Sequence, residues 1–285
     1  MNKQRTIIFF LISGILLSAC NLNVTAIKPT QTPASYSGLQ EAPASGVSTP
    51  LPVRPAYKPG ELVDYTAQSG DTLIALASHF NTSVAEIMAA NPIIPADATT
   101  MPAGFPMRIP IYYKSLWANP YKILPDAAFV NGPMQTGFNT SAFVASQPGW
   151  LKDYQAFAGS GPKLTGAEIV DYVSTNWSVS PRLLLALLEY RTGALSQSTP
   201  PSDPYMLGYQ QSFYKGLYLQ LVLAANTLNN GYYGWRAGKL SEFYLSDGTI
   251  IRPDPWQNAA SVGIQFFFSR FQNRSDYERS TGPTG

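Results

Sequence analysis

The chain has 285 residues, enough for about two domains at roughly 150 residues each. Hydrophobic residues make up 45% and charged residues only 13%, with 24 Pro and 22 Gly, which indicates a folded protein with some irregular chain attached. The formal net charge is +2, and Lys3 and Arg5 of an expected leader account for that excess. No basic surface is left to displace counterions from phosphates, so nucleic acid is set aside as a partner.

Residues 1–19 have the features of a secretory signal peptide. Lys3 and Arg5 supply the positive start, and the apolar run over 7–17 is too short to cross a bilayer core of about 30 Å as a helix. The run ends in Leu17-Ser18-Ala19-Cys20, which resembles the bacterial lipobox. This resemblance implies cleavage before Cys20 and lipidation of its sulfur.

Cys20 is the only cysteine, so an intramolecular disulfide is impossible. We therefore expect an exported lipoprotein, anchored to a membrane at the bacterial cell surface or in the envelope. The alternative is an ordinary leader whose cleavage site happens to precede a cysteine. After the lipidated residue, the stretch 20–60 is rich in Pro, Ser and Thr and shows no hydrophobic period, which predicts an extended tether.

Residues 61–113 predict a small β-α-α-β module. The alternation over 62–67 predicts a strand, and Asp71 is expected to cap a helix whose apolar face follows helical spacing. Thr82 or Ser83 is expected to cap a second helix, which stops at Asn91-Pro92 because the residue before proline avoids helical geometry. A closing strand is expected over 107–111.

The stretch YTAQSGDTLIALASHFNTSVAEIMAANPIIP, followed by MPAGFPMRIP, resembles a LysM domain over its whole length. The matching positions are Gly70, Asp71, Thr72, Leu73, Ala77, Asn91, Gly104, Ile109 and Pro110. The resemblance implies binding of glycans that contain N-acetylglucosamine, chiefly peptidoglycan and also chitin. The implied groove lies between two loops, formed by Gly70, Asp71, Thr72 and Leu73 and by Asn91, Pro92, Ile93 and Ile94.

Two of these residues have a second interpretation, because Asp71 can act only as a cap and Ile93 only as core. The sole histidine, His79, has no His, Cys or carboxylate partner at ligand spacing. We therefore expect no metal site, and no cofactor is indicated.

The second half of the chain predicts a mainly helical domain over 165–275, after an irregular connecting region at 114–164. Thr165 and Glu168 form a capping box, and Ser180-Pro181 opens a buried helix that ends at Gly193. A long helix is expected over about 212–230, a hairpin turn at Asp247-Gly248 and a final helix from 254. Residues 276–285 are expected to be a tail, and the fold class is α+β.

The segment PRLLLALLEYRTGAL, followed by Gly208-Tyr209-Gln210, resembles lysozyme-like lytic transglycosylases. In the register anchored at Ala186 and Gly193, the position of the catalytic acid is occupied by Arg191. Arginine keeps its proton at physiological pH. Glu189 lies two residues earlier, about 200° away around a helix.

Three functions follow from these resemblances. The first is a lipid-anchored protein that binds peptidoglycan through one LysM module, with a helical domain that is not catalytic. The second is a peptidoglycan hydrolase or lytic transglycosylase with Glu189 as general acid and the aromatic residues 232–235 beside a sugar groove. In the third, the chain resembles the front part of some bacterial wall endopeptidases, which carry a lysostaphin-like zinc domain further on.

Overall fold

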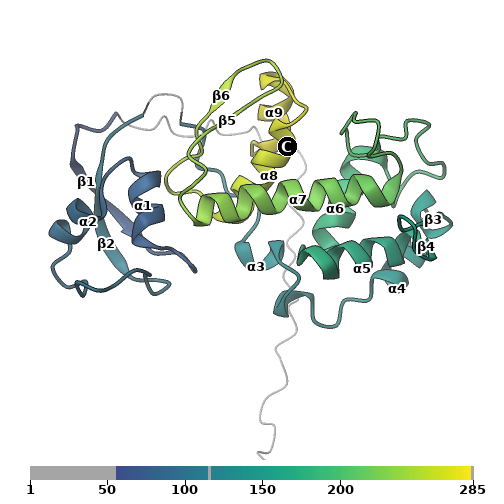
Figure 1. Cartoon of the computed structure of the whole chain (residues 1–285), viewed down its shortest axis with the longest axis horizontal. Coiled ribbons are helices and arrows are strands. Elements are labelled where there is room, and N and C mark those ends of the chain that lie inside the picture. The colour runs from purple at the N-terminus through teal and green to yellow at the C-terminus, as the bar shows by residue number, and fades with distance from the viewer. Residues whose placement is uncertain (1–55, 115–116, 284–285) are drawn as a thin grey trace, which may run out of the picture. The chain divides into compact units, whose positions relative to one another are not determined.

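The computed structural model describes residues 56–114 and 117–283 (Figure 1). The expected signal peptide, Cys20 and most of the expected tether lie outside the described residues. Within them, a β-α-α-β module precedes a mainly helical region, which confirms the expected α+β class.

The β-α-α-β module contains all four expected elements. Strand β1 (Glu61–Thr66) pairs antiparallel with β2 (Pro106–Ile111), with Val63 opposite Ile109. Helices α1 (Leu73–His79) and α2 (Val84–Ala90) lie between them in sequence. Their apolar faces pack on the strands in one core, in which the fully buried side chains include Leu76, Phe80, Ile87 and Ile109.

The cap of α1 differs from the expected one. Thr72, not Asp71, is the N-cap, and its hydroxyl accepts from the backbone N–H of Ala75. Asp71 is one residue too early, and its carboxylate instead accepts from Gln68 N–H and Tyr65 OH, both at 2.7 Å. The expected capping of α2 is confirmed for Ser83, which forms a capping box with Glu86.

The region expected to be irregular contains short elements of its own. These are α3 (Asp126–Phe129), η1 (Pro133–Gln135), α4 (Thr140–Ala145), η2 (Trp150–Lys152), β3 (Gln155–Phe157) and β4 (Lys163–Thr165). Phe129, Trp150 and Leu151 from this region are buried in the same core as the long helices. The segment is therefore an integral part of the helical domain rather than a connection to it.

Helices α5 (Gly166–Trp177) and α6 (Pro181–Thr192) confirm their sequence signals. Thr165 and Glu168 form both hydrogen bonds of a capping box. The Ser180 hydroxyl accepts from the backbone N–H of Leu183, and α6 ends at Gly193 in the left-handed region, at φ 61°. Local capping chemistry was sufficient to place both helices.

Three boundaries in the last third of the chain were predicted wrongly. Helix α7 spans Leu217–Arg236 instead of 212–230, because it continues through an aromatic segment whose Tyr232 and Trp235 are buried. After the expected hairpin, β5 (Phe243–Tyr244) and β6 (Ile250–Ile251), helix α8 covers Ala259–Ser269 and begins later than residue 254. Helix α9 (Arg274–Thr281) replaces most of the expected tail, and it buries Tyr277.

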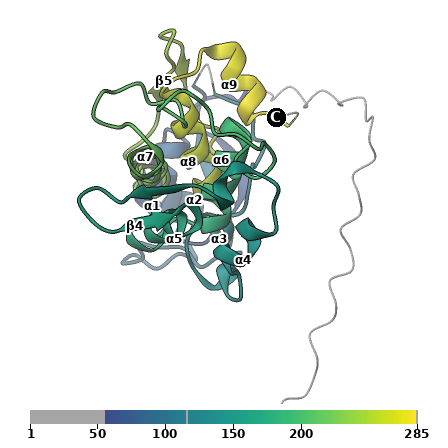
Figure 2. The ribbon, with the colours of Figure 1, turned by 90° about the vertical axis from the view of Figure 1, so that its right-hand side faces the viewer.

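The helical domain is built around α7, which packs against α8 and α5 (Figures 1 and 2). Gly231 and Gly263 allow the backbones of α7 and α8 to approach closely. A Cβ atom at Gly231 would lie 2.9 Å from the Gly263 Cα and 2.7 Å from the Phe266 Cβ. Among the described residues, no single helix is long and apolar enough to span a membrane, and only α1 and α2 together, bent by 100°, reach that length and composition.

We expect Gly231→Ala to destabilise the protein by about 1–3 kcal/mol, because the new methyl group forces α8 away from α7. Gly234→Ala is the matched control on the same helix, where the nearest atom to an added Cβ is the Leu240 Cβ at 3.1 Å. Both changes bring the same gain in helix propensity. Urea unfolding would contradict the packing argument if the two variants had equal midpoints.

Candidate functional site

A groove of about 430 Å³ runs along one side of the β-α-α-β module. Its lining comes from β1, from the end of α2 and the loop after it, and from β2: Asp64, Tyr65, Thr66, Ala90, Asn91, Pro92, Ile93, Pro106, Met107 and Arg108. Ile93 is 79% exposed, although it is aliphatic. Asp64 and Arg108 face each other across the two strands, with 3.8 Å between Oδ1 and Nε. The groove thus combines an apolar patch with a polar wall, a pattern typical of small-ligand sites.

Only one of the two expected loops lines this groove. Asn91, Pro92 and Ile93 belong to it, while Gly70, Asp71, Thr72 and Leu73 do not. Ile94 and Leu73 are buried in the core of the module, and Thr72 is used as the cap of α1. Asn91 is structural as well, because its amide group bonds to the backbone of Arg108 and to Ile87 O.

Gly70 and Asp71 lie instead against the helical domain. The guanidinium of Arg236 packs on Gly70 so closely that an added Cβ would lie 1.5 Å from its Nη2. Asp71 shares a nearly closed pocket with His79, Asp126 and Arg236. Burial, as the largest cause, raises the pKa of Asp71. Asp71 and Thr72 of this loop are half-buried, and Gly70 is exposed but lies outside the groove.

The contact between the module and the helical domain is centred on His79. Its ring stacks on Trp235 with 3.5 Å between ring centroids and 8° between planes. The His79 Nε2 lies 3.0 Å from the backbone oxygen of Trp235, and since a carbonyl only accepts, Nε2 carries the proton. Burial lowers the pKa of His79 to about 4. The histidine is therefore a neutral structural residue.

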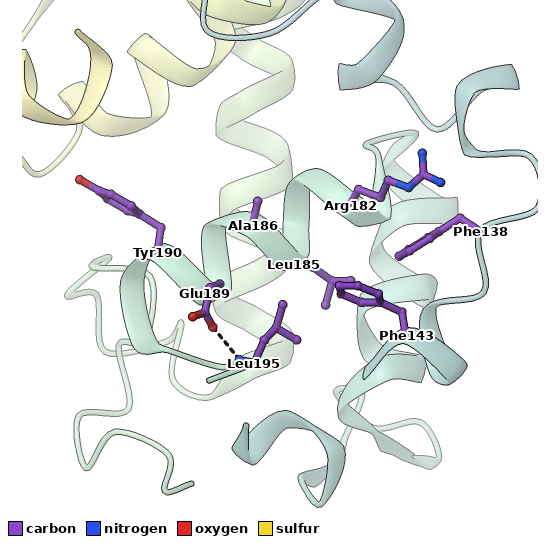
Figure 3. A pocket seen from close by; sticks show the side chains of 8 residues that line it. All are labelled: Phe138, Phe143, Arg182, Leu185, Ala186, Glu189, Tyr190 and Leu195. Carbon is purple, nitrogen blue, oxygen red and sulfur yellow. Dashed lines mark hydrogen bonds between the residues drawn. The ribbon is translucent and has the colours of Figure 1, made fainter. Parts of the chain in front are cut away.

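Glu189, the candidate catalytic acid, lines a separate pocket of about 500 Å³. Figure 3 shows it on α6 with Leu185, Ala186 and Tyr190, with Phe138, Phe143 and Arg182 toward the other end of the pocket. The pocket is mainly apolar and aromatic. Its wall contains neither Tyr209 and Gln210 nor the aromatic residues of α7.

The carboxylate of Glu189 is held by the loop that follows α6. One oxygen accepts from Leu195 N–H at 2.7 Å, drawn as the dashed line in Figure 3, and the other from the Ser196 hydroxyl at 2.6 Å. A structural alternative to a catalytic role would be an ion pair of Glu189 with Arg182 or Arg236. Neither pair is formed within the described chain, since Arg182 donates to Met134 O and Arg236 to Tyr232 OH. Both carboxylate oxygens of Glu189 are therefore already engaged by this loop.

Arg191 and the Gly208-Tyr209-Gln210 segment meet in another pocket. The structure thus separates Glu189 from the segment that was expected to lie opposite it. Of the aromatic residues in 232–235, Tyr232 and Trp235 are buried, and Tyr233 is exposed. Among the described residues, no group of three or more His, Cys, Asp or Glu side chains is placed to hold a metal ion.

The strand residues of the groove were missed by sequence reasoning. Asp64, Thr66 and Arg108 are the outward-facing positions of two alternating strands. That alternation was visible in the sequence and could have placed them on one face. In the structure these strand residues line one groove with the loop after α2, which contains Pro92 and Ile93.

The groove and its fold define a LysM-containing protein, and residues 65–110 match the LysM domain family. Residues 122–281, more than half of the chain, match the family described as "LasA, N-terminal domain". The chain belongs to this family. Comparison with curated proteins and with solved structures gives no match.

The buried His79 predicts a stability that falls in acid. Its folded pKa of about 4 lies below its ordinary value of 6.5, so between these values the unfolded chain binds more protons. Acidification through this window therefore removes up to about 3 kcal/mol from the free energy of unfolding. This should be measured by urea unfolding above pH 6.5 and near pH 4.

His79→Phe is the matched variant, because it keeps an aromatic ring against Trp235 but cannot titrate. It should be less stable than the parent above pH 6.5, where the parent keeps its hydrogen bond. The difference should narrow toward pH 4, because only the parent loses the contribution of His79 to stability, while carboxylates such as Asp71 titrate in both proteins and cancel. A constant difference across this range would show that His79 is not the titrating group.

Proposed function

We propose that the protein binds peptidoglycan or a related N-acetylglucosamine glycan in the groove beside Ile93. The observation that carries this proposal is an exposed aliphatic side chain, that of Ile93, in the lining of a formed groove in a LysM domain. Such domains support carbohydrate binding and association with the cell wall. The site is narrower than the one expected from sequence, because Pro92 and Ile93 are the two of the eight expected residues that are both exposed and in the lining of the groove.

The chemistry of the groove suits a sugar chain. Pro92 and Ile93 offer an apolar surface to the C–H face of a pyranose ring, whose burial is favourable. Asp64, Thr66 and Arg108 present acceptors and donors along the opposite wall, where hydroxyl and acetamido groups can bond.

We also propose that Cys20 is lipidated after removal of residues 1–19, and that the tether over 20–60 carries the module from the membrane to the wall. The sequence at Leu17-Ser18-Ala19-Cys20 supports this anchor. Retention near the wall would then depend on two attachments, the lipid anchor and the glycan site. Because one chain links them, each increases the apparent affinity of the other.

Ile93→Asp should weaken sedimentation with insoluble peptidoglycan by about tenfold in apparent Kd, because a desolvated carboxylate replaces the apolar contact. The protein to use is residues 20–285 with Cys20→Ser. Ile74→Asp is the control, since Ile74 is 67% exposed but lies outside the groove. Equal sedimentation of both variants and the parent would contradict the proposed site.

The helical domain is proposed to contribute contacts rather than glycan cleavage. Both oxygens of Glu189 already accept hydrogen bonds within the loop that follows α6. No residue of the Gly208–Gln210 segment lines its pocket. In the lysozyme-like register the catalytic position is occupied by Arg191, which cannot act as a general acid.

Glu189→Gln is expected to leave soluble muropeptide release from wall suspensions unchanged, because the parent itself releases none. The variant should instead lose about 1–3 kcal/mol of stability, since a neutral amide replaces the charged acceptor of two hydrogen bonds. Thermal unfolding measures this loss. Release by the parent that disappears in Glu189→Gln would establish the enzymatic alternative.

A further inference from the structure

A polar pocket of about 480 Å³ lies where the ends of α6 and α8 meet the loop before α7. Its lining carries two guanidinium groups, those of Arg191 and Arg270, together with Asp203 and the amides of Gln210 and Gln211. The pocket has no part in the glycan groove or in the pocket of Glu189. Its chemistry is therefore unused by the proposed function.

Both guanidinium groups are held in place by aromatic rings. Arg191 lies over Phe271 at 5.0 Å from the ring centroid, and Arg270 over Phe266 at 5.6 Å. Over the described part of the chain, neither guanidinium takes part in a hydrogen bond or an ion pair. These cation–π contacts favour these positions of the groups while their N–H donors stay available. Partial burial also lowers the pKa of Arg191, a sign of incomplete compensation by neighbouring acids.

The loop around Gly208 forms one wall of the pocket, and the fully buried side chain of Gln220 holds it in place. Its Oε1 accepts from Leu207 N–H at 3.0 Å, and its Nε2 donates to Tyr209 O at 3.0 Å. Gly208 then passes beside Arg191, at φ +99°, where a Cβ would lie 2.9 Å from the Arg191 Nη2. The loop is thus shaped before any ligand arrives, which reduces the entropic cost of binding.

The mixture of charges selects among possible anions. Two fixed guanidinium groups match the planar oxygens of a carboxylate or the oxygens of a phosphate. Asp203, whose Oδ1 accepts from Tyr205 N–H, repels a polyanion but can accept from an N–H donor. A group that carries one carboxylate and nearby N–H donors fits this pattern, and the end of a peptide has both.

We propose that this pocket binds the carboxylate end of a peptide, with Arg191 and Arg270 on the carboxylate and Asp203 on an N–H group of the same ligand. In a wall-associated protein, such a site would add recognition of peptide to recognition of glycan. The glycan groove and this pocket share no residue, so a substitution can abolish binding at one site and leave the other intact.

The test uses residues 20–285 with Cys20→Ser, selectively labelled for NMR of the arginine Nε–H groups. The probes are trialanine, trialanine amide and inorganic phosphate. Trialanine should shift the Arg191 and Arg270 signals and bind at least about tenfold more tightly than its amide, because only the free acid forms charge-assisted hydrogen bonds. Phosphate should bind more weakly than trialanine.

Arg191→Gln and Arg270→Gln should each weaken trialanine binding about tenfold, while Arg279→Gln on the exposed face of α9 leaves it unchanged. Chitin, which carries no peptide, separates the two sites. Ile93→Asp should lose chitin but keep trialanine, and Arg270→Gln should do the reverse. Equal binding of acid and amide, tighter binding of phosphate, or no shift at millimolar trialanine would each overturn the proposal.

Discussion

The buried stack of His79 on Trp235 is the contact on which the arrangement of the molecule depends. It places the end of α1 against the end of α7, and the neutral imidazole donates to the Trp235 carbonyl, which also accepts from Gly238 N–H at 2.9 Å. Around it, Trp256 packs edge-on against Phe80 at 4.8 Å, and Gln68 reaches the backbone of the same segment. Aromatic burial thus fixes the β-α-α-β module to the helical domain.

This fixation has a consequence for ligand binding. The first loop of the module was expected to share a glycan groove with the second, yet Arg236 packs beside Gly70, Asp71 is half-buried, and neither residue of this loop lines the groove. The groove lies along the strands instead, and Asp64 and Arg108 line it where residues 70–73 had been expected. The same sequence motif can therefore present a different binding surface when a neighbouring domain occupies one of its sides.

Sequence was a good guide wherever a local interaction determines the structure. Ser83, Thr165 and Ser180 cap their helices as expected, since a cap requires only residues within one turn. The errors arose where tertiary burial decides. Helix α7 extends to Arg236 because Trp235 is buried against another module. Likewise, α9 forms where a tail was expected because Tyr277 packs near Phe243. Neither partner could be identified from local spacing.

The separation of chemistry on α6 follows from helix geometry. Glu189 and Arg191 differ by two residues, so their side chains leave the helix about 200° apart. One therefore points to Leu195 and the apolar pocket, while the other points to Gly208 and the polar pocket. A carboxylate general acid and the Gly208–Gln210 segment can act together only if they share a face of this helix. No change of rotamer moves the Glu189 side chain to the opposite side of α6. Acid chemistry beside the Gly208–Gln210 segment would therefore require a carboxylate at position 191 or one from the loop, where Asp203 lines the same pocket as Arg191 and Arg270.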